Sequence, residues 1–172
     1  MKMIIDEVNR SVDFWINALN NYSFEMLFLK PSPDSWSIGQ MYQHLLNDTL
    51  FYLDQAELAL ADKYNQTKDT TVDGRKMLDE NAFPDIRLEG HPSNASIPQP
   101  VSKQYIFDSM IELKGRLNEM AVKIEASAVQ GKSQHPGLGY FTAKEWLQFA
   151  GMHLRHHMKQ KERIDEFISQ QT

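Results

Sequence analysis

The sequence contains no cysteine, which excludes a disulfide framework, a cysteine-based zinc site and a cysteine nucleophile. Any metal ion must therefore be held by histidine, aspartate or glutamate. The sequence also lacks an apolar run near the ~20 residues that a membrane span needs. Its N-terminal segment sets acidic and polar residues beside the first apolar pair, unlike a signal peptide. We therefore expect a cytoplasmic protein with no membrane partner.

Positive charge is scarce as well, because 18 lysines and arginines face 23 acidic residues and the net charge is -5. A protein that binds nucleic acid needs a basic face for the phosphates, so we expect no nucleic-acid partner. The 41% hydrophobic and 24% charged residues are typical of a globular protein. A chain of 172 residues is long enough to bury its own core. We expect one domain over residues 1–172.

Strand patterns are also absent, since no segment alternates polar and apolar residues with a period of two. Four segments instead repeat apolar residues at spacings of three and four, which predicts helices over about residues 3–21, 37–61, 102–126 and 143–168. Capping boxes at Ser37/Gln40 and Thr142/Glu145 mark the starts of the second and fourth helices. Between helices two and three, residues 63–100 allow only a short helix around 74–81. The pattern predicts an all-α four-helix bundle with a long connection between helices two and three.

Polar residues interrupt the apolar face of the last predicted helix. At about 100° per residue, His153, His157 and Gln160 share the arc that contains Trp146 and Phe149. Burying such groups without partners costs about 1–3 kcal/mol each, so they need partners in the core. Two histidines four residues apart project from one helix face, as they do in helical zinc sites. Metal ligation and hydrogen-bonded core histidines are both open as interpretations.

A third ligand has to come from another helix. His44 is the only other histidine on a predicted long helix, and it lies at the edge of the apolar face beside Asp48. Ligand and hydrogen-bonded core residue are both open as interpretations of His44. Three neutral imidazoles with one vacant position would suit Zn²⁺, Ni²⁺ or Fe²⁺ in a reactive site.

Five further polar residues complete the candidate set. Asp48 and Gln160 can orient the ligands or accept a hydrogen bond from water on the metal, or they can form ordinary contacts between helices. His156 points about 80° away from the centre of the apolar face, so we expect it at the surface or beside the ligands. His91 and His135 fall in predicted loops, where we expect them to be solvated.

Two motifs stand out in the sequence. The first is Trp36-Ser37-Ile38-Gly39-Gln40 followed by His44-Leu45. The second is His153-Leu154-Arg155-His156-His157-Met158-Lys159-Gln160. Together they resemble the DinB/YfiT-like superfamily of damage-inducible bacterial proteins, and the second is similar to that family's H-x-x-H-H-x-x-H/Q signature. The resemblance covers nearly the whole chain. It implies a four-helix bundle with one divalent metal ion (Zn, Ni or Fe) held by His44, His153 and His157.

Relatives in this superfamily are similar in fold and differ in chemistry. They include thiol S-transferases that use bacillithiol, mycothiol-dependent isomerases and proteins described as metal-dependent hydrolases, and many form dimers. The first hypothesis is an enzyme that directs a small thiol co-substrate at an electrophilic substrate. The second is a hydrolase in which Asp48 or Gln160 positions water, although no H-E-x-x-H glutamate is present. The third is a non-catalytic metal-binding stress protein, and no catalytic residue is assigned.

Overall fold

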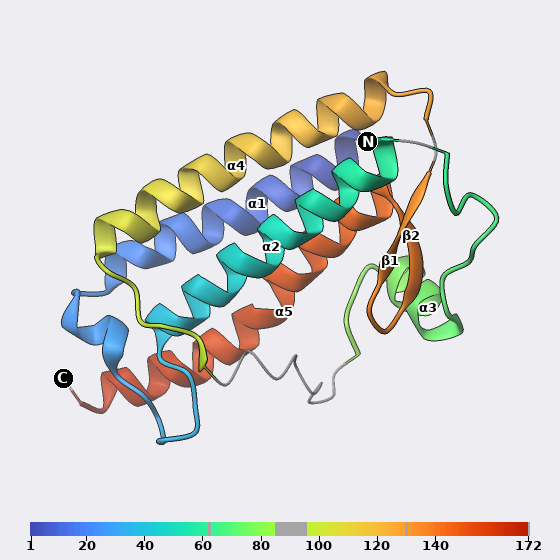
Figure 1. Ribbon diagram of the computed structural model, residues 1–172. Helices are drawn as coiled ribbons and strands as arrows, with labels where there is room; N and C mark the ends of the chain where they lie inside the picture. Colours follow the sequence, from blue (N-terminus) through green and yellow to red (C-terminus); the bar gives the residue numbers. More distant parts are fainter. Residues whose placement is uncertain (62, 85–95, 130, 172) are drawn as a thin grey trace.

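The chain folds into a bundle of long helices with a small hairpin at one end (Figure 1). The computed structural model describes residues 1–61, 63–84, 96–129 and 131–171. The long helices, which lie side by side in Figure 1, are α1 (Lys2–Ala18), α2 (Ile38–Ala61), α4 (Lys103–Ala126) and α5 (Ala143–Ser169). Two 3₁₀ turns, Leu19–Asn21 and Glu25–Phe28, follow α1. The expected all-α bundle is confirmed, and each long helix begins and ends close to its predicted bounds.

The long connection between the second and third bundle helices has a topological cause. In Figure 1, α2 and α4 run in the same direction, so the chain must return along the bundle before α4 begins. The short helix expected around residues 74–81 is present as α3 (Val72–Glu80). Thr71 caps α3 by accepting a hydrogen bond from the Gly74 N–H at 3.1 Å.

Both predicted capping boxes are present and fix where α2 and α5 begin. The Ser37 hydroxyl accepts from the Gln40 N–H at 3.2 Å, and the Gln40 side chain accepts from the Ser37 N–H at 3.1 Å. Thr142 and Glu145 form the same reciprocal pair at the start of α5. The Gln40 side chain also donates to the Ile97 carbonyl at 2.6 Å, so this cap ties the end of the connection to α2.

The core lies between the four long helices and contains satisfied polar groups. The Trp15 indole donates to the Leu154 carbonyl at 3.0 Å, and the Tyr42 hydroxyl donates to the Trp15 carbonyl at 2.7 Å. All three side chains are fully buried. These bonds set the rotation of α1 and α2 against the middle of α5, where the paired histidines lie.

One short segment between α4 and α5 forms strands, although the sequence shows no strand pattern there. Strands β1 (Lys132–His135) and β2 (Gly139–Thr142) form an antiparallel hairpin. The strands are too short for a period-two pattern to stand out. Tertiary bonds stabilise them instead: the Ser133 hydroxyl donates to the Gln55 carbonyl at 2.8 Å and accepts from the Trp146 indole at 2.6 Å.

The expected solvation of His135 was wrong. Its ring stacks on Trp146 with centroids 5.4 Å apart, and its Nδ1 accepts from the N–H groups of Gly137 and Leu138 at 3.1 and 3.2 Å. The hairpin turn therefore uses an imidazole as its hydrogen-bond acceptor. His91 lies outside the described residues.

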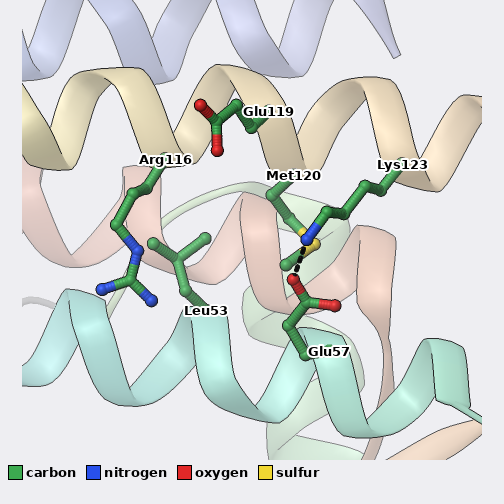
Figure 2. Close-up of a pocket in the computed structure, with 6 residues that line it drawn as sticks. All are labelled: Leu53, Glu57, Arg116, Glu119, Met120 and Lys123. Atoms are coloured by element: carbon green, nitrogen blue, oxygen red, sulfur yellow. Dashed lines mark hydrogen bonds and ion pairs between the residues drawn. The ribbon is translucent and has the colours of Figure 1, made fainter.

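A surface groove runs between α2 and α4 (Figure 2). An ion pair between Lys123 and Glu57 bridges it. None of the candidate site residues is among those that line it, which are Leu53, Glu57, Arg116, Glu119, Met120 and Lys123. Within the described part of the chain, no helix has both the length and the apolar character to cross a membrane.

Candidate metal centre

The structure brings His44, His153 and His157 together between two helices. His44 lies on the second turn of α2, and the other two lie on adjacent turns near the middle of α5. All three side chains are buried, with 4%, 4% and 7% of their surface exposed. Among the described residues they form the one cluster of three metal-ligating groups whose donor atoms converge. We call these three residues the histidine triad.

The three Nε2 atoms of the histidine triad form a nearly equilateral triangle. The distance from His44 to His153 is 3.0 Å, and the distances from His157 to the other two are 3.1 Å. Each neutral imidazole nitrogen carries either a hydrogen or a lone pair, so at least two of the three are of the same kind. At least one of the three contacts therefore pairs two donors or two acceptors. Hydrogen bonds within the triad cannot satisfy all three Nε2 atoms.

A divalent cation fits this triangle. Metal–nitrogen bonds of about 2.0–2.1 Å set ligand nitrogens roughly 3.3 Å apart in a tetrahedral site and roughly 2.9 Å apart in an octahedral one. The observed 3.0–3.1 Å lies between these values. One cation can accept all three lone pairs, which resolves the conflict between like groups. The residues present fit a metal ion, and the imidazole donors do not by themselves select its identity.

Neighbouring side chains contact two of the three rings, and one of these contacts is a hydrogen bond. The Nδ1–H of His157 donates to the Gln160 side-chain oxygen at 2.9 Å, which leaves its Nε2 lone pair directed at the other histidines. Asp48 lies one turn after His44, with a carboxylate oxygen 3.5 Å from the Nδ1 of His44. The Nδ1 of His153 is buried and has no hydrogen-bond partner among the described residues.

Burial keeps the histidine triad uncharged at neutral pH. It lowers the pKa of His44 to about 3, with further lowering from His157 and His156. Burial also lowers the pKa of His157 to about 4, although the Gln160 hydrogen bond acts in the opposite direction. The pKa of His153 lies well below its ordinary value for the same primary reason. Neutral imidazole is the form that ligates a metal, so the lone pairs are available.

Asp48 lies between the histidine triad and solvent. Its side chain is 33% exposed, and its second carboxylate oxygen is 3.6 Å from the Nε2 of His153. The Tyr52 hydroxyl is hydrogen-bonded to Asp48, and burial followed by this carboxylate raises the pKa of Tyr52 well above its ordinary value. Tyr52 therefore stays a proton donor that holds the carboxylate beside the triad.

Two aromatic rings that sequence reasoning did not assign to the site pack against the triad. Trp36 lies 4.7 Å from His44 and 6.2 Å from His157 between ring centroids. Phe83, in the connection after α3, lies 6.1 Å from His153. Trp36 is marked in the sequence by its place before the capping box, whereas Phe83 carries no periodic signal.

His156 lies beside the triad and outside it. Its partly exposed ring is 5.1 Å from His157 and 5.0 Å from Phe83. Of the three candidates for supporting roles, Gln160 makes a short hydrogen bond to the triad, Asp48 makes longer polar contacts with it, and His156 packs its ring against it. Their functional roles stay predictions.

Comparisons with known proteins agree with this architecture. The family described as the DinB superfamily matches residues 15–160, a range that contains all three triad histidines. An uncharacterized protein of Bacillus subtilis (strain 168), YuaE, is 24% identical over 159 residues, which cover 88% of this chain and 91% of YuaE. No solved structure matches the chain.

Proposed function

This chain belongs to the DinB superfamily, and from its histidine triad we propose that it binds one divalent metal ion through His44, His153 and His157. The observation that carries the proposal is the triangle of Nε2 atoms 3.0–3.1 Å apart. We further propose that the protein is an enzyme of the thiol S-transferase type, which joins a small thiol to an electrophilic substrate. Because the chain has no cysteine, the thiol has to be a co-substrate.

The protein's own residues would each have a distinct part in this function. A bound divalent ion would lower the pKa of a thiol and so supply a thiolate near neutral pH. Gln160 holds the His157 ring in the ligating tautomer. Asp48, held by Tyr52, offers a carboxylate beside the triad that can take a proton. Trp36 and Phe83 exclude water from the ring faces that they cover.

Metal binding is tested first, on protein purified without a histidine tag. We expect about one equivalent of Zn, Ni or Fe in the wild type by elemental analysis and a large loss of metal in His157→Ala. His156→Ala is the matched control, because His156 neighbours the triad without joining the triangle. Unchanged metal content in His157→Ala would refute the assignment of the triad.

Transferase activity is tested separately, with metal-loaded and metal-free protein. Monochlorobimane or fluorodinitrobenzene serves as the electrophile, together with a panel of low-molecular-weight thiols. We expect conjugation above the uncatalysed rate only in the metal-loaded sample. If the protein binds metal but conjugates none of these thiols, the transferase proposal fails and the metal centre stands.

The position of Asp48 favours a second candidate function, metal-dependent hydrolysis. A carboxylate 3.6 Å from a triad nitrogen can serve as a general base for water. Ester turnover that is lost in Asp48→Asn with metal content retained would favour this function. If neither thiols nor esters turn over while metal still stabilises the fold, a non-catalytic metal-binding protein is the remaining explanation.

A further inference from the structure

The end of α3 is tied to the bundle through Asn81. This residue adopts a left-handed conformation, with φ of 50°, that ends the helix. Its side-chain amide donates to a Glu7 carboxylate oxygen on α1 at 2.8 Å. Gln148 on α5 donates to the Leu78 carbonyl at 2.7 Å. An exposed short helix is thereby held against two long ones.

Arg155 completes this attachment from α5. One of its terminal nitrogens donates both to the Asn81 carbonyl at 2.9 Å and to the Asn81 side-chain oxygen at 3.0 Å. Its other terminal nitrogen lies 3.6 Å from the Glu7 carboxylate. We call Glu7, Asn81 and Arg155 the α3 clamp. Hydrogen bonds from a charged group are stronger than those between neutral groups, so the clamp favours one position of the chain at Asn81.

The α3 clamp is adjacent to the histidine triad in two ways. Along α5, Arg155 lies between His153 and His157, with its side chain turned towards Asn81. Along the connection, Phe83 follows Asn81 by two residues and packs its ring 4.9 Å from Phe149 and 6.1 Å from His153. A shift of the chain at Asn81 would therefore be transmitted to the Phe83 ring, which lies beside His153.

We infer that Arg155 is a positioning residue which, through Asn81, holds Phe83 over His153 and so limits how fast solutes reach the histidine triad. The proposed function gives the triad its role, and this inference adds which residues control access to it. Phe83 is then the residue whose size decides what can approach the triad from the side of His153.

The test uses metal-free protein, so that it does not depend on metal binding. Diethylpyrocarbonate modifies neutral imidazoles, and peptide mapping by mass spectrometry gives the rate for each histidine. We expect Phe83→Ala to raise the modification rate of His153 about tenfold or more, because it removes the cover. Arg155→Met and Asn81→Gly should raise it by a similar factor, since losing even one such bond shifts an opening equilibrium by about tenfold or more.

Each variant is chosen to change one feature. Asn81→Gly removes the side-chain bonds and keeps a residue that adopts positive φ freely. Arg155→Met keeps an unbranched side chain and removes the donors. Asn118→Ala is the matched control, because Asn118 forms a reciprocal pair with Asn9 between α1 and α4, at 2.9 and 3.0 Å. Circular dichroism and melting temperature report folding, and Phe83→Leu replaces Phe83→Ala if the latter does not fold.

The results separate the inference from its alternatives. Faster His153 modification in the Phe83 and clamp variants, with an unchanged rate in Asn118→Ala, supports it. Faster modification in the Phe83 variant alone would show that the clamp does not position the ring, and unchanged rates in all of them would show that Phe83 is no barrier. An equal increase in Asn118→Ala would also overturn it. A wild type that binds no metal would refute the proposed function and leave these rates unaffected.

Discussion

The substitution His153→Leu should have opposite effects on stability with and without metal. In metal-free protein the Nδ1 of His153 is buried without a partner, and its Nε2 belongs to the triangle in which at least two like groups meet. Removing one unsatisfied buried polar group recovers about 1–3 kcal/mol. For a chain of this size each kcal/mol shifts the melting temperature by roughly 2–4 °C. We therefore expect metal-free His153→Leu to melt about 2–12 °C above the metal-free wild type.

With metal bound, the wild type should instead be more stable than His153→Leu. A ligand at about 1,000 times its dissociation constant adds about 4.1 kcal/mol to the free energy of unfolding. The wild type gains this stabilisation and His153→Leu does not, and it exceeds the roughly 1–3 kcal/mol that the substitution recovers. Calorimetry in chelator and in excess Zn²⁺ measures both quantities on the same samples. His156→Leu is the control, and it should keep the metal-induced shift because its ring lies outside the triangle.

The result that would refute the reasoning is a metal-free His153→Leu that is less stable than the metal-free wild type by more than about 1 kcal/mol. Such a loss is what removing a satisfied core residue produces. It would mean that His153 is a hydrogen-bonded core histidine, the interpretation that the sequence alone leaves open.

Three further predictions follow from particular contacts. Gln160→Leu should weaken metal affinity about tenfold in a chelator competition, because the His157 ring loses its orienting bond; unchanged affinity would exclude that role. Burial lowers the pKa of His135 to about 4. Between about pH 6.5 and 4, His135 therefore binds a proton in the unfolded chain but not in the folded chain. Stability is lost as pH falls through this window, and His135→Asn should remove about 2 kcal/mol of the loss between pH 7 and 5 in denaturant titrations; an equal acid sensitivity in the variant would contradict this. Gly39→Ala should destabilise by about 1–3 kcal/mol, since an added Cβ would lie 2.7 Å from the Leu27 carbonyl oxygen; wild-type stability would show that the backbone there yields easily.

The helices were predictable because their signals are local. Apolar residues at spacings of three and four, together with two capping boxes, fix the long helices to within a few residues. The paired histidines on α5 were accessible for the same reason, since residues four apart share a helix face. His44 was not accessible from pattern alone, because 109 residues separate it from His153 and only tertiary packing brings them together. Its assignment came from the family resemblance.

The features that the sequence did not predict lie in segments without a repeating pattern of apolar residues. The hairpin is stabilised by contacts of Ser133 with Gln55 and Trp146, and no sequence pattern in either strand indicates these contacts. His135 was expected in solvent because it falls in a predicted loop, and nothing in the local sequence indicates that its ring stacks on Trp146. Phe83 is positioned through hydrogen bonds of Asn81 to helices remote in sequence. In each case the information is a pairing between distant residues, which a single sequence does not display.

The positions of buried polar atoms without hydrogen bonds show where the fold is destabilised. Folded proteins leave few buried polar side chains without partners, and here the buried tryptophans Trp15 and Trp146 both have theirs. Within the described residues, the buried side-chain atoms with no hydrogen bond are the Nδ1 atoms of His44 and His153 and the hydroxyl of Thr49, which follows Asp48 on α2. Two of these three atoms belong to the histidine triad. An ion held by the three Nε2 atoms would resolve the conflict within the triangle. It would leave the Nδ1 atoms without partners, so part of the cost of burying these imidazoles stays in the metal-bound protein.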